Sequence, residues 1–198
     1  MTEMYITGDS HGWLNVKLTS TSQVVALPKY LKVDLLETKN KRDHFTIKEG
    51  TYKDKAASVS LKSNGKSWLG TPLPDYGSGV SLIFKKGEEC LITPLGKIKA
   101  ITDDDNPIPN GTHPIQIPDF PHKLGRGYLS QAQLAMTWFY LGSGAAVSNN
   151  NDRYLHPGAV SLGCITIEEV SKWDALCEKL LLARESGGLN VGKVTVQD

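Results

Sequence analysis

The sequence predicts a mainly β protein, an antiparallel sandwich or barrel with one amphipathic helix near the C-terminus and one further short helix. Three observations support this fold class. Many short stretches alternate polar and apolar residues or are rich in β-branched residues. Turn-forming clusters such as Ser63-Asn64-Gly65-Lys66 separate them. The 19 glycines and 10 prolines follow no period, which excludes a collagen-like chain.

The strands are predicted in chain order at 31–36, 44–48, 57–61, 80–84, 90–93, 97–101, 113–117, 137–141 and 192–196. At roughly 150 residues per domain, a chain of 198 residues holds one large domain with a modest appendage. We expect residues 29–198 to form that domain. Residues 1–28 are expected to form an N-terminal strand or extension packed on it.

Two segments carry helix signals. In 129–136, Ser130 and Gln133 form a capping-box pair over good helix formers, which predicts about two turns. A longer helix is predicted to begin at Thr166, with Glu169 completing its cap, and to end at the glycine pair 187–188. Its apolar face comprises Val170, Trp173, Leu176, Cys177, Leu180 and Leu181.

Charge and hydropathy exclude several classes. The 22 basic and 21 acidic side chains leave a net charge of +1, so no overall field points to nucleic acid or to an anionic membrane. No apolar run reaches the length of a membrane span, and the N-terminal residues lack a basic region followed by an apolar one. We therefore expect synthesis in the cytoplasm without a signal peptide.

One of the three cysteines lies in a segment suited to catalysis. Cys90 and Cys177 lie in apolar stretches and are predicted to be core residues. Cys164 follows His156, Ser161 and Gly163 closely, so a tight loop can bring an imidazole to its thiol. The amides of Gly163 and Cys164 are candidate oxyanion donors. The alternative is that this segment is simply a strand entering the core.

The stretch His156-Pro-Gly-Ala-Val-Ser161-Leu-Gly163-Cys164-Ile165 resembles the active-site signature of the L,D-transpeptidase (YkuD-type) family. The upstream stretch 108–115 resembles that family's Pro-x-Gly-Thr-x-x-Ile turn and strand. The resemblance implies an L,D-transpeptidase-like β-sandwich over 29–198. It also implies that Cys164 is the nucleophile, that His156 is the general base and that Gly163 and Cys164 are the oxyanion donors. The implied reaction is acyl transfer on peptidoglycan stem peptides through a thioester.

The motif departs from the usual family pattern at two positions. Leu162 replaces a second histidine, and Thr166 replaces an arginine, so a group that holds a substrate carboxylate must come from Arg153 or Arg126. The predicted substrate-binding residues are Arg153, Tyr154, Leu162 and Arg126. The short spacing between His156 and Cys164 resembles the branch of the family that type VI secretion delivers as antibacterial toxins. That branch implies action in the periplasm and an immunity protein as a partner.

Two other functions stay open at this stage. A cysteine amidase of the NlpC/P60 kind places its cysteine before its histidine, whereas His156 is the last histidine of this chain. A β-sandwich binding module that keeps the signature without its chemistry is suggested by Leu162 and Thr166.

Other motifs are interpreted as turns or loops. The Gly8-Asp-Ser-His-Gly12 stretch lacks the preceding parallel strand of a nucleophile elbow. The acidic turn at 103–106 breaks the calcium-loop pattern at Pro107, and His113 and His122 lack zinc-ligand spacing, so we expect no metal or other cofactor. The small, polar stretch 142–152 is interpreted as a surface loop or a lid.

Overall fold

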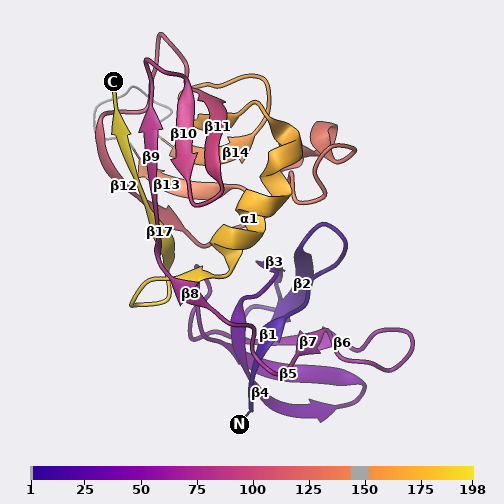
Figure 1. The fold of residues 1–198 in the computed structure, drawn as a ribbon. Helices are drawn as coiled ribbons and strands as arrows, with labels where there is room; N and C mark the ends of the chain where they lie inside the picture. Colours follow the sequence, from indigo (N-terminus) through magenta and orange to yellow (C-terminus); the bar gives the residue numbers. More distant parts are fainter. Residues whose placement is uncertain (1, 144–151) are drawn as a thin grey trace.

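The computed structural model describes residues 2–143 and 152–198 (Figure 1). The N-terminal strands form a seven-stranded sheet in the order β3-β2-β6-β5-β4-β1-β7. Its strands are β1 (Thr2–Ile6), β2 (Trp13–Leu18), β3 (Val24–Pro28), β4 (Lys32–Lys39), β5 (Arg42–Ile47), β6 (Ala56–Ser60) and β7 (Leu69–Gly70). All the pairings within this sheet are antiparallel.

The rest of the chain forms an eight-stranded sheet in the order β12-β17-β9-β10-β11-β15-β14-β13. Its strands are β9 (Val80–Lys85), β10 (Cys90–Thr93), β11 (Gly96–Ile101), β12 (Gly111–Gln116), β13 (Phe139–Ser143), β14 (Asp152–Pro157), β15 (Ile165–Ile167) and β17 (Asn190–Gln197). The pairs β9–β17 and β14–β15 are parallel. The two outer strands, β12 and β13, lie against each other, so the sheet folds back on itself.

The mainly β fold class is confirmed, and every strand predicted from periodicity is present. The expected division after residue 28 does not follow a sheet boundary. Strands β1 to β3 belong to the same sheet as β4 to β7, and β1 lies between β4 and β7. The pairing of β1 with β4 and with β7, and of β2 with β6, decides this grouping, and none of these pairings carries a signal in the local pattern.

The helices differ from the predictions in their bounds. Residues 129–136 form turns, and a 3-10 helix, η1 (Lys123–Tyr128), lies just before them. The backbone N–H groups of Gln133 and Leu134 donate to the Asp174 carboxylate, each at 2.8 Å, instead of closing helical turns. The helix predicted at 129–136 is therefore wrong because a distant side chain takes its donors.

The C-terminal helix is confirmed, but it starts later than predicted and ends at Leu181 rather than at the glycine pair 187–188, because residues 183–184 already form a strand. After β15 come the short 3-10 helix η2 (Val170–Lys172) and α1 (Trp173–Leu181), which buries the predicted apolar face. Thr166 lies in β15 and not at a helix cap, and the Glu169 carboxylate accepts the backbone N–H of Lys99 at 2.7 Å. The predicted capping box is therefore wrong, since both of its members bond to other strands.

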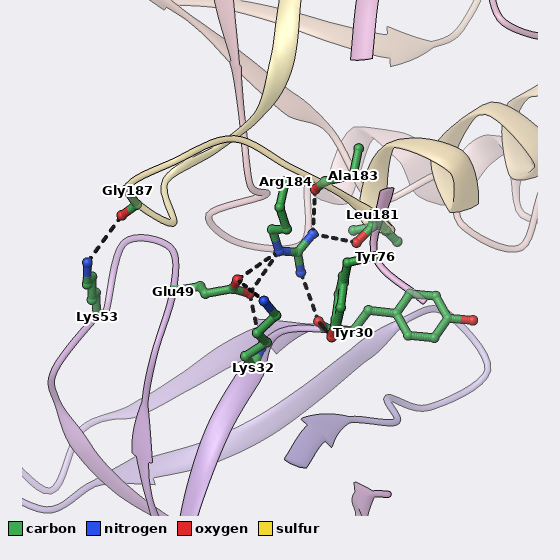
Figure 2. Close-up of polar contacts among 9 residues, drawn as sticks. All are labelled: Tyr30, Lys32, Glu49, Lys53, Tyr76, Leu181, Ala183, Arg184 and Gly187. Atoms are coloured by element: carbon green, nitrogen blue, oxygen red, sulfur yellow. Dashed lines mark hydrogen bonds and ion pairs between the residues drawn. The ribbon is translucent and has the colours of Figure 1, made fainter. Parts of the chain in front are cut away.

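The two sheets meet at a polar cluster around Arg184 of the short strand β16 (Ala183–Arg184), which pairs with β8 (Gly77–Ser78). Figure 2 shows the Arg184 guanidinium pointing at Glu49, with Nε 2.9 Å from both carboxylate oxygens. The same group donates to the backbone carbonyls of Tyr30, Leu181 and Ala183. Near them, Lys29 pairs with Glu178 of α1 at 2.6 Å. These contacts tie the N-terminal sheet to the C-terminal half of the chain.

Within residues 2–143 and 152–198, no helix has the length and apolar character needed to cross a membrane.

Candidate active site

The parallel pair β14–β15 brings together the residues of the predicted motif. The register pairs Leu155 with Ile165 and His156 with Thr166. One step earlier in this register, the backbone N–H of Tyr154 donates to the Cys164 sulfur at 3.4 Å. Cys164 itself lies one residue before β15, and this contact sets its sulfur against the backbone of β14, two residues before His156. Leu155 and Ile165 lie on the other face of the strand pair from His156 and are fully buried.

Two contacts orient the His156 ring. Its Nδ1 lies 3.1 Å from the Pro157 carbonyl oxygen, and its Nε2 lies 3.2 Å from the Thr166 hydroxyl. A carbonyl oxygen can only accept, so Nδ1 carries the proton and donates to Pro157. Nε2 therefore holds the lone pair that a general base needs, but this lone pair accepts the Thr166 hydroxyl, which must turn away before Nε2 can take a proton from another group.

The ionisation of both groups is set by burial. Burial lowers the pKa of His156 to about 4, against a smaller opposite effect of the Pro157 carbonyl, so the ring is neutral near pH 7. Burial raises the pKa of the Cys164 thiol, whereas the Tyr154 N–H and the Arg153 charge act in the opposite direction. The structure thus pairs a neutral imidazole with a neutral thiol, the starting state for general-base catalysis rather than for a preformed thiolate. Among the described residues, no hydrogen bond links the ring to the thiol.

A tight loop places Cys164 directly before β15. The Ser161 hydroxyl donates to the Cys164 carbonyl at 2.9 Å and accepts the Gly163 N–H at 3.2 Å. Gly163 has a φ of +110°, and a Cβ there would lie 2.5 Å from the Asn106 carbonyl oxygen and 2.8 Å from Arg153 Cζ. Only glycine fits this backbone. Since Ser161 holds the Gly163 amide, the predicted oxyanion role of Gly163 requires this amide to exchange Ser161 for a substrate oxygen.

The predicted substrate-binding residues are not all at the surface. Leu162 is 67% exposed, Arg126 is exposed on η1, and Tyr154 is half-buried. Arg153 is only 1% exposed, and its Nη2 donates to the Asn106 side chain at 2.9 Å. Burial disfavours a direct contact of Arg153 with a substrate carboxylate. Its position beneath Gly163 instead suits an electrostatic role toward Cys164.

Aromatic side chains form a column beside His156 that the sequence analysis missed. Trp138 stacks between His156, at 4.1 Å between ring centroids, and His122, at 4.5 Å. Phe120 stacks on the outer side of His122, and the edge of Tyr154 contacts the His122 ring. The column fixes the plane of the His156 ring.

An acidic side chain completes the surroundings of this column. Asp119 lies 3.3 Å from His122 Nε2 and accepts the Tyr154 hydroxyl at 3.4 Å. Alternation placed residue 138 only within the strand predicted at 137–141, and His122 was excluded as a zinc ligand by its spacing. No local pattern connects residues so far apart in the chain, and the signal that existed was the unusual density of rings between 120 and 140.

Two further predictions concern segments near the site. Most of the stretch 142–152, interpreted as a surface loop or a lid, lies outside the described residues. Among the residues that the structure describes, no group of three or more His, Cys, Asp and Glu side chains is placed to hold a metal ion.

Comparisons with known proteins found remote matches among solved structures. No protein-family model matches the chain, and neither does any curated protein. An L,D-transpeptidase from Xylanimonas cellulosilytica (residues 123–326) matches with 13% identity and a TM-score of 0.36, over 65% of each chain. L,D-transpeptidase 1 of Mycobacterium tuberculosis matches with 9% identity and a TM-score of 0.35, over 84% of this chain and 92% of that one. The chain thus spans just under two thirds of the first structure.

The fold and the site together define a mainly β protein with a histidine on β14 and a cysteine directly before β15, its parallel neighbour. At similarities this low, the residues around Cys164 have to carry the inference of function.

Proposed function

We propose that this protein catalyses cysteine-dependent acyl transfer on peptidoglycan stem peptides, as an L,D-transpeptidase or L,D-carboxypeptidase. One observation carries the proposal. The Pro157 carbonyl accepts from Nδ1 of His156, so Nε2 is the basic nitrogen of a ring on β14, and the Cys164 sulfur lies against the N–H of Tyr154 on the same strand, two residues away. The peptidoglycan substrate rests on the resemblance of 156–165 and 108–115 to the L,D-transpeptidase motifs.

The reaction has two steps. Once the Thr166 hydroxyl has turned away from His156 Nε2, the Cys164 sulfur attacks the carbonyl carbon of a peptide bond while its proton passes to that nitrogen. The tetrahedral intermediate collapses to a thioester as the C–N bond breaks, and His156 returns the proton to the leaving amine. An acceptor amine or water then attacks the thioester, His156 accepts its proton, and the thiol is regenerated. The surrounding groups serve both steps. Arg153 and the backbone amides near Gly163 stabilise negative charge as it develops.

Mass spectrometry of purified muropeptides incubated with the protein tests this function. Wild type is expected to yield cross-linked, exchanged or trimmed peptides, which differ in mass, and to show a thioester adduct on intact protein. Cys164→Ala and His156→Gln are each expected to lose at least about a thousandfold in rate. Cys90→Ser serves as the control because Cys90 lies in β10, away from the motif. Equal activity in Cys164→Ala and wild type would end the proposal.

A second candidate is a binding module without catalysis. Three observations favour it: Thr166 contacts the basic nitrogen of His156, Ser161 holds the Gly163 amide, and the pKa of Cys164 is raised. In that case, wild type and Cys164→Ala bind cell-wall sacculi equally in a pelleting assay and neither changes the muropeptides. Product formation that depends on Cys164 excludes this candidate.

The proposed place of action is the periplasm, after delivery as an antibacterial effector. This part rests on the short spacing between His156 and Cys164. Expression in the cytoplasm is then harmless, whereas the same chain fused to a periplasmic signal peptide causes swelling or lysis. The matched control is Cys164→Ala carrying the same signal peptide. Cytoplasmic toxicity, or periplasmic toxicity that survives this substitution, contradicts the effector role.

An effector of this kind requires a neutralising partner in the producing cell. The proposed partner is an immunity protein that covers the surface around His156 and Cys164, because blocking the nucleophile protects the cell wall. Coexpression of such a partner with the chain that carries the signal peptide is expected to restore growth.

A further inference from the structure

Strands β2 and β6 of the N-terminal sheet separate along part of their length. β2 pairs with β3 from Trp13 to Lys17, but with β6 only at Lys17–Ser58 and Leu18–Ala57. β6 in turn pairs with β5 along its full length, up to Ser60. The first half of β2 therefore faces the second half of β6 without pairing to it.

The backbone groups at this gap point into it. Thr19 donates its N–H to the Ala56 carbonyl, and hydrogen-bonded pairs alternate along antiparallel strands. The next such pair is Lys17–Ser58, and the one after it would be Asn15–Ser60. The N–H of the neighbouring Leu61 points away from β2 and donates to the Lys41 carbonyl, next to β5. The amides and carbonyls of Asn15 and Ser60 are therefore directed at the gap, where the described pairing of β2 with β6 has already ended.

A hollow lies at this gap. It is a cavity of about 620 Å³ lined by Leu14 to Lys17 on one side and Ser58 to Lys62 on the other, with Trp68 also on its wall. A neighbouring hollow of about 560 Å³ shares the wall from Ser60 to Ser63. The two hollows lie along the same strand edge, which suits an extended chain.

The charge of the walls favours an acidic ligand. Lys17, Arg42 and Lys62 line the cavity, against the carboxylate of Asp9. Asp9 already accepts the N–H groups of His11 and Trp13. The Arg42 guanidinium is fixed by the Ser58 and Ser60 hydroxyls, and the Lys62 ammonium lies 4.4 Å from the centre of the Trp68 ring. These cations therefore border a row of backbone donors and acceptors.

We propose that the gap between β2 and β6 binds an extended acidic segment of a partner protein, which adds a short strand between them. Main-chain hydrogen bonds to Asn15 and Ser60 supply the affinity, and alternate acidic side chains meet Lys17, Arg42 and Lys62. The intervening side chains of the segment face the interior and are small and apolar. This site is independent of the function proposed for Cys164.

A fluorescein-labelled peptide of alternating Glu and Val residues, measured by fluorescence anisotropy with the full chain, tests the proposal. Binding is expected for this peptide and not for its Lys/Val counterpart. A peptide with proline at its centre, which lacks one backbone donor, is expected to bind about tenfold more weakly. Equal binding of the Glu and Lys peptides overturns the proposal, and so does the absence of any binding.

Charge reversal in the protein supplies the matched variants. Lys17→Glu and Lys62→Glu are each expected to weaken binding about tenfold, whereas Lys193→Glu on β17 leaves it unchanged. Hydrogen exchange supplies a readout of the backbone. The peptide is expected to slow exchange of the Asn15 and Ser60 amides, and unchanged exchange there refutes strand addition. Self-association that Lys17→Glu abolishes would instead assign the gap to a second copy of this chain and overturn the partner-segment proposal.

Discussion

At the scale of single residues, the buried His156 makes stability depend on pH. Its pKa is lowered to about 4 from an ordinary value of 6.5. Between these values the unfolded chain binds a proton that the folded chain does not. The free energy of unfolding therefore falls as pH drops from about 6.5 to about 4, by roughly 3 kcal/mol, and this contribution levels off below.

Urea unfolding of wild type and His156→Gln across this range measures the effect. The variant lacks the ionisable ring. The difference in the free energy of unfolding between wild type and variant should therefore shrink by roughly 3 kcal/mol as the pH falls from about 6.5 to about 4. A difference that stays constant with pH would show that the His156 ring is not held neutral.

The raised pKa of Cys164 makes a second prediction at this scale. Burial keeps the thiol protonated, so its alkylation by iodoacetamide should reach half its maximal rate above the pH of about 8.5 typical of a free thiol. Peptide mass spectrometry distinguishes Cys164 from the buried Cys90 and Cys177. A midpoint well below the ordinary value would indicate a preformed thiolate, and general-base activation by neutral His156 would then be wrong.

At the scale of elements, the loop before β15 depends on the close approach of Gly163 to Asn106 and Arg153. Gly163→Ala is expected to cost about 1–3 kcal/mol from the positive φ alone, and more from the contact with the Asn106 carbonyl oxygen. Gly96→Ala is a matched control, because Gly96 has a φ of +105° and no described atom within 4 Å of an added Cβ. Thermal unfolding of both variants separates the two effects. Equal losses of stability in Gly163→Ala and Gly96→Ala would show that the close approach of Gly163 to Asn106 and Arg153 contributes nothing.

The aromatic column beside His156 gives a second prediction at the scale of elements. Trp138→Leu removes the ring that stacks on His156, while Trp138→Phe keeps an aromatic face there. Trp138→Leu is expected to lower kcat about tenfold or more, because a misplaced base loses much of its effect, and to raise the pKa of His156 as water reaches the ring. His156 titration by NMR provides this readout, which a purely structural loss would not move. Trp138→Phe should stay close to wild type in both measurements.

At the scale of the whole molecule, the ion pair of Arg184 and Glu49 joins the two sheets (Figure 2). Their side chains are 9% and 6% exposed, so removal of one partner leaves the other charge buried. Arg184→Met is expected to lower the free energy of unfolding by about 3–5 kcal/mol. The double variant Arg184→Met/Glu49→Leu should regain much of this loss. Urea unfolding measures both.

Lys86→Met is the control for a surface pair, since its partner Asp198 is 82% exposed. It should change stability little. A loss in Arg184→Met no larger than in Lys86→Met would mean that the cluster does not hold the sheets together.

Much of the local structure could be read from the sequence. Alternation predicted nine of the strands, because a side-chain period of two needs no long-range information. The apolar face of α1 and the grouping of His156, Ser161, Gly163 and Cys164 were also visible as spacing. The prediction did not give β1, β2, β3 and β14 as separate strands, although β2 does alternate, and the strands β7, β8, β15 and β16 have only two or three residues, too few to show a period.

How these pieces contact one another depends on the folded chain. The donors of Gln133 and Leu134 go to Asp174 and prevent a helix, and Arg153 turns inward beneath Gly163. Trp138 and His122 reach His156 only because β13, β14 and the turn before η1 come together in space. Hydrogen bonding and stacking between residues distant in the chain leave no period in the sequence. The orientation of the His156 ring, and with it the chemistry of the site, therefore depends on the folded chain.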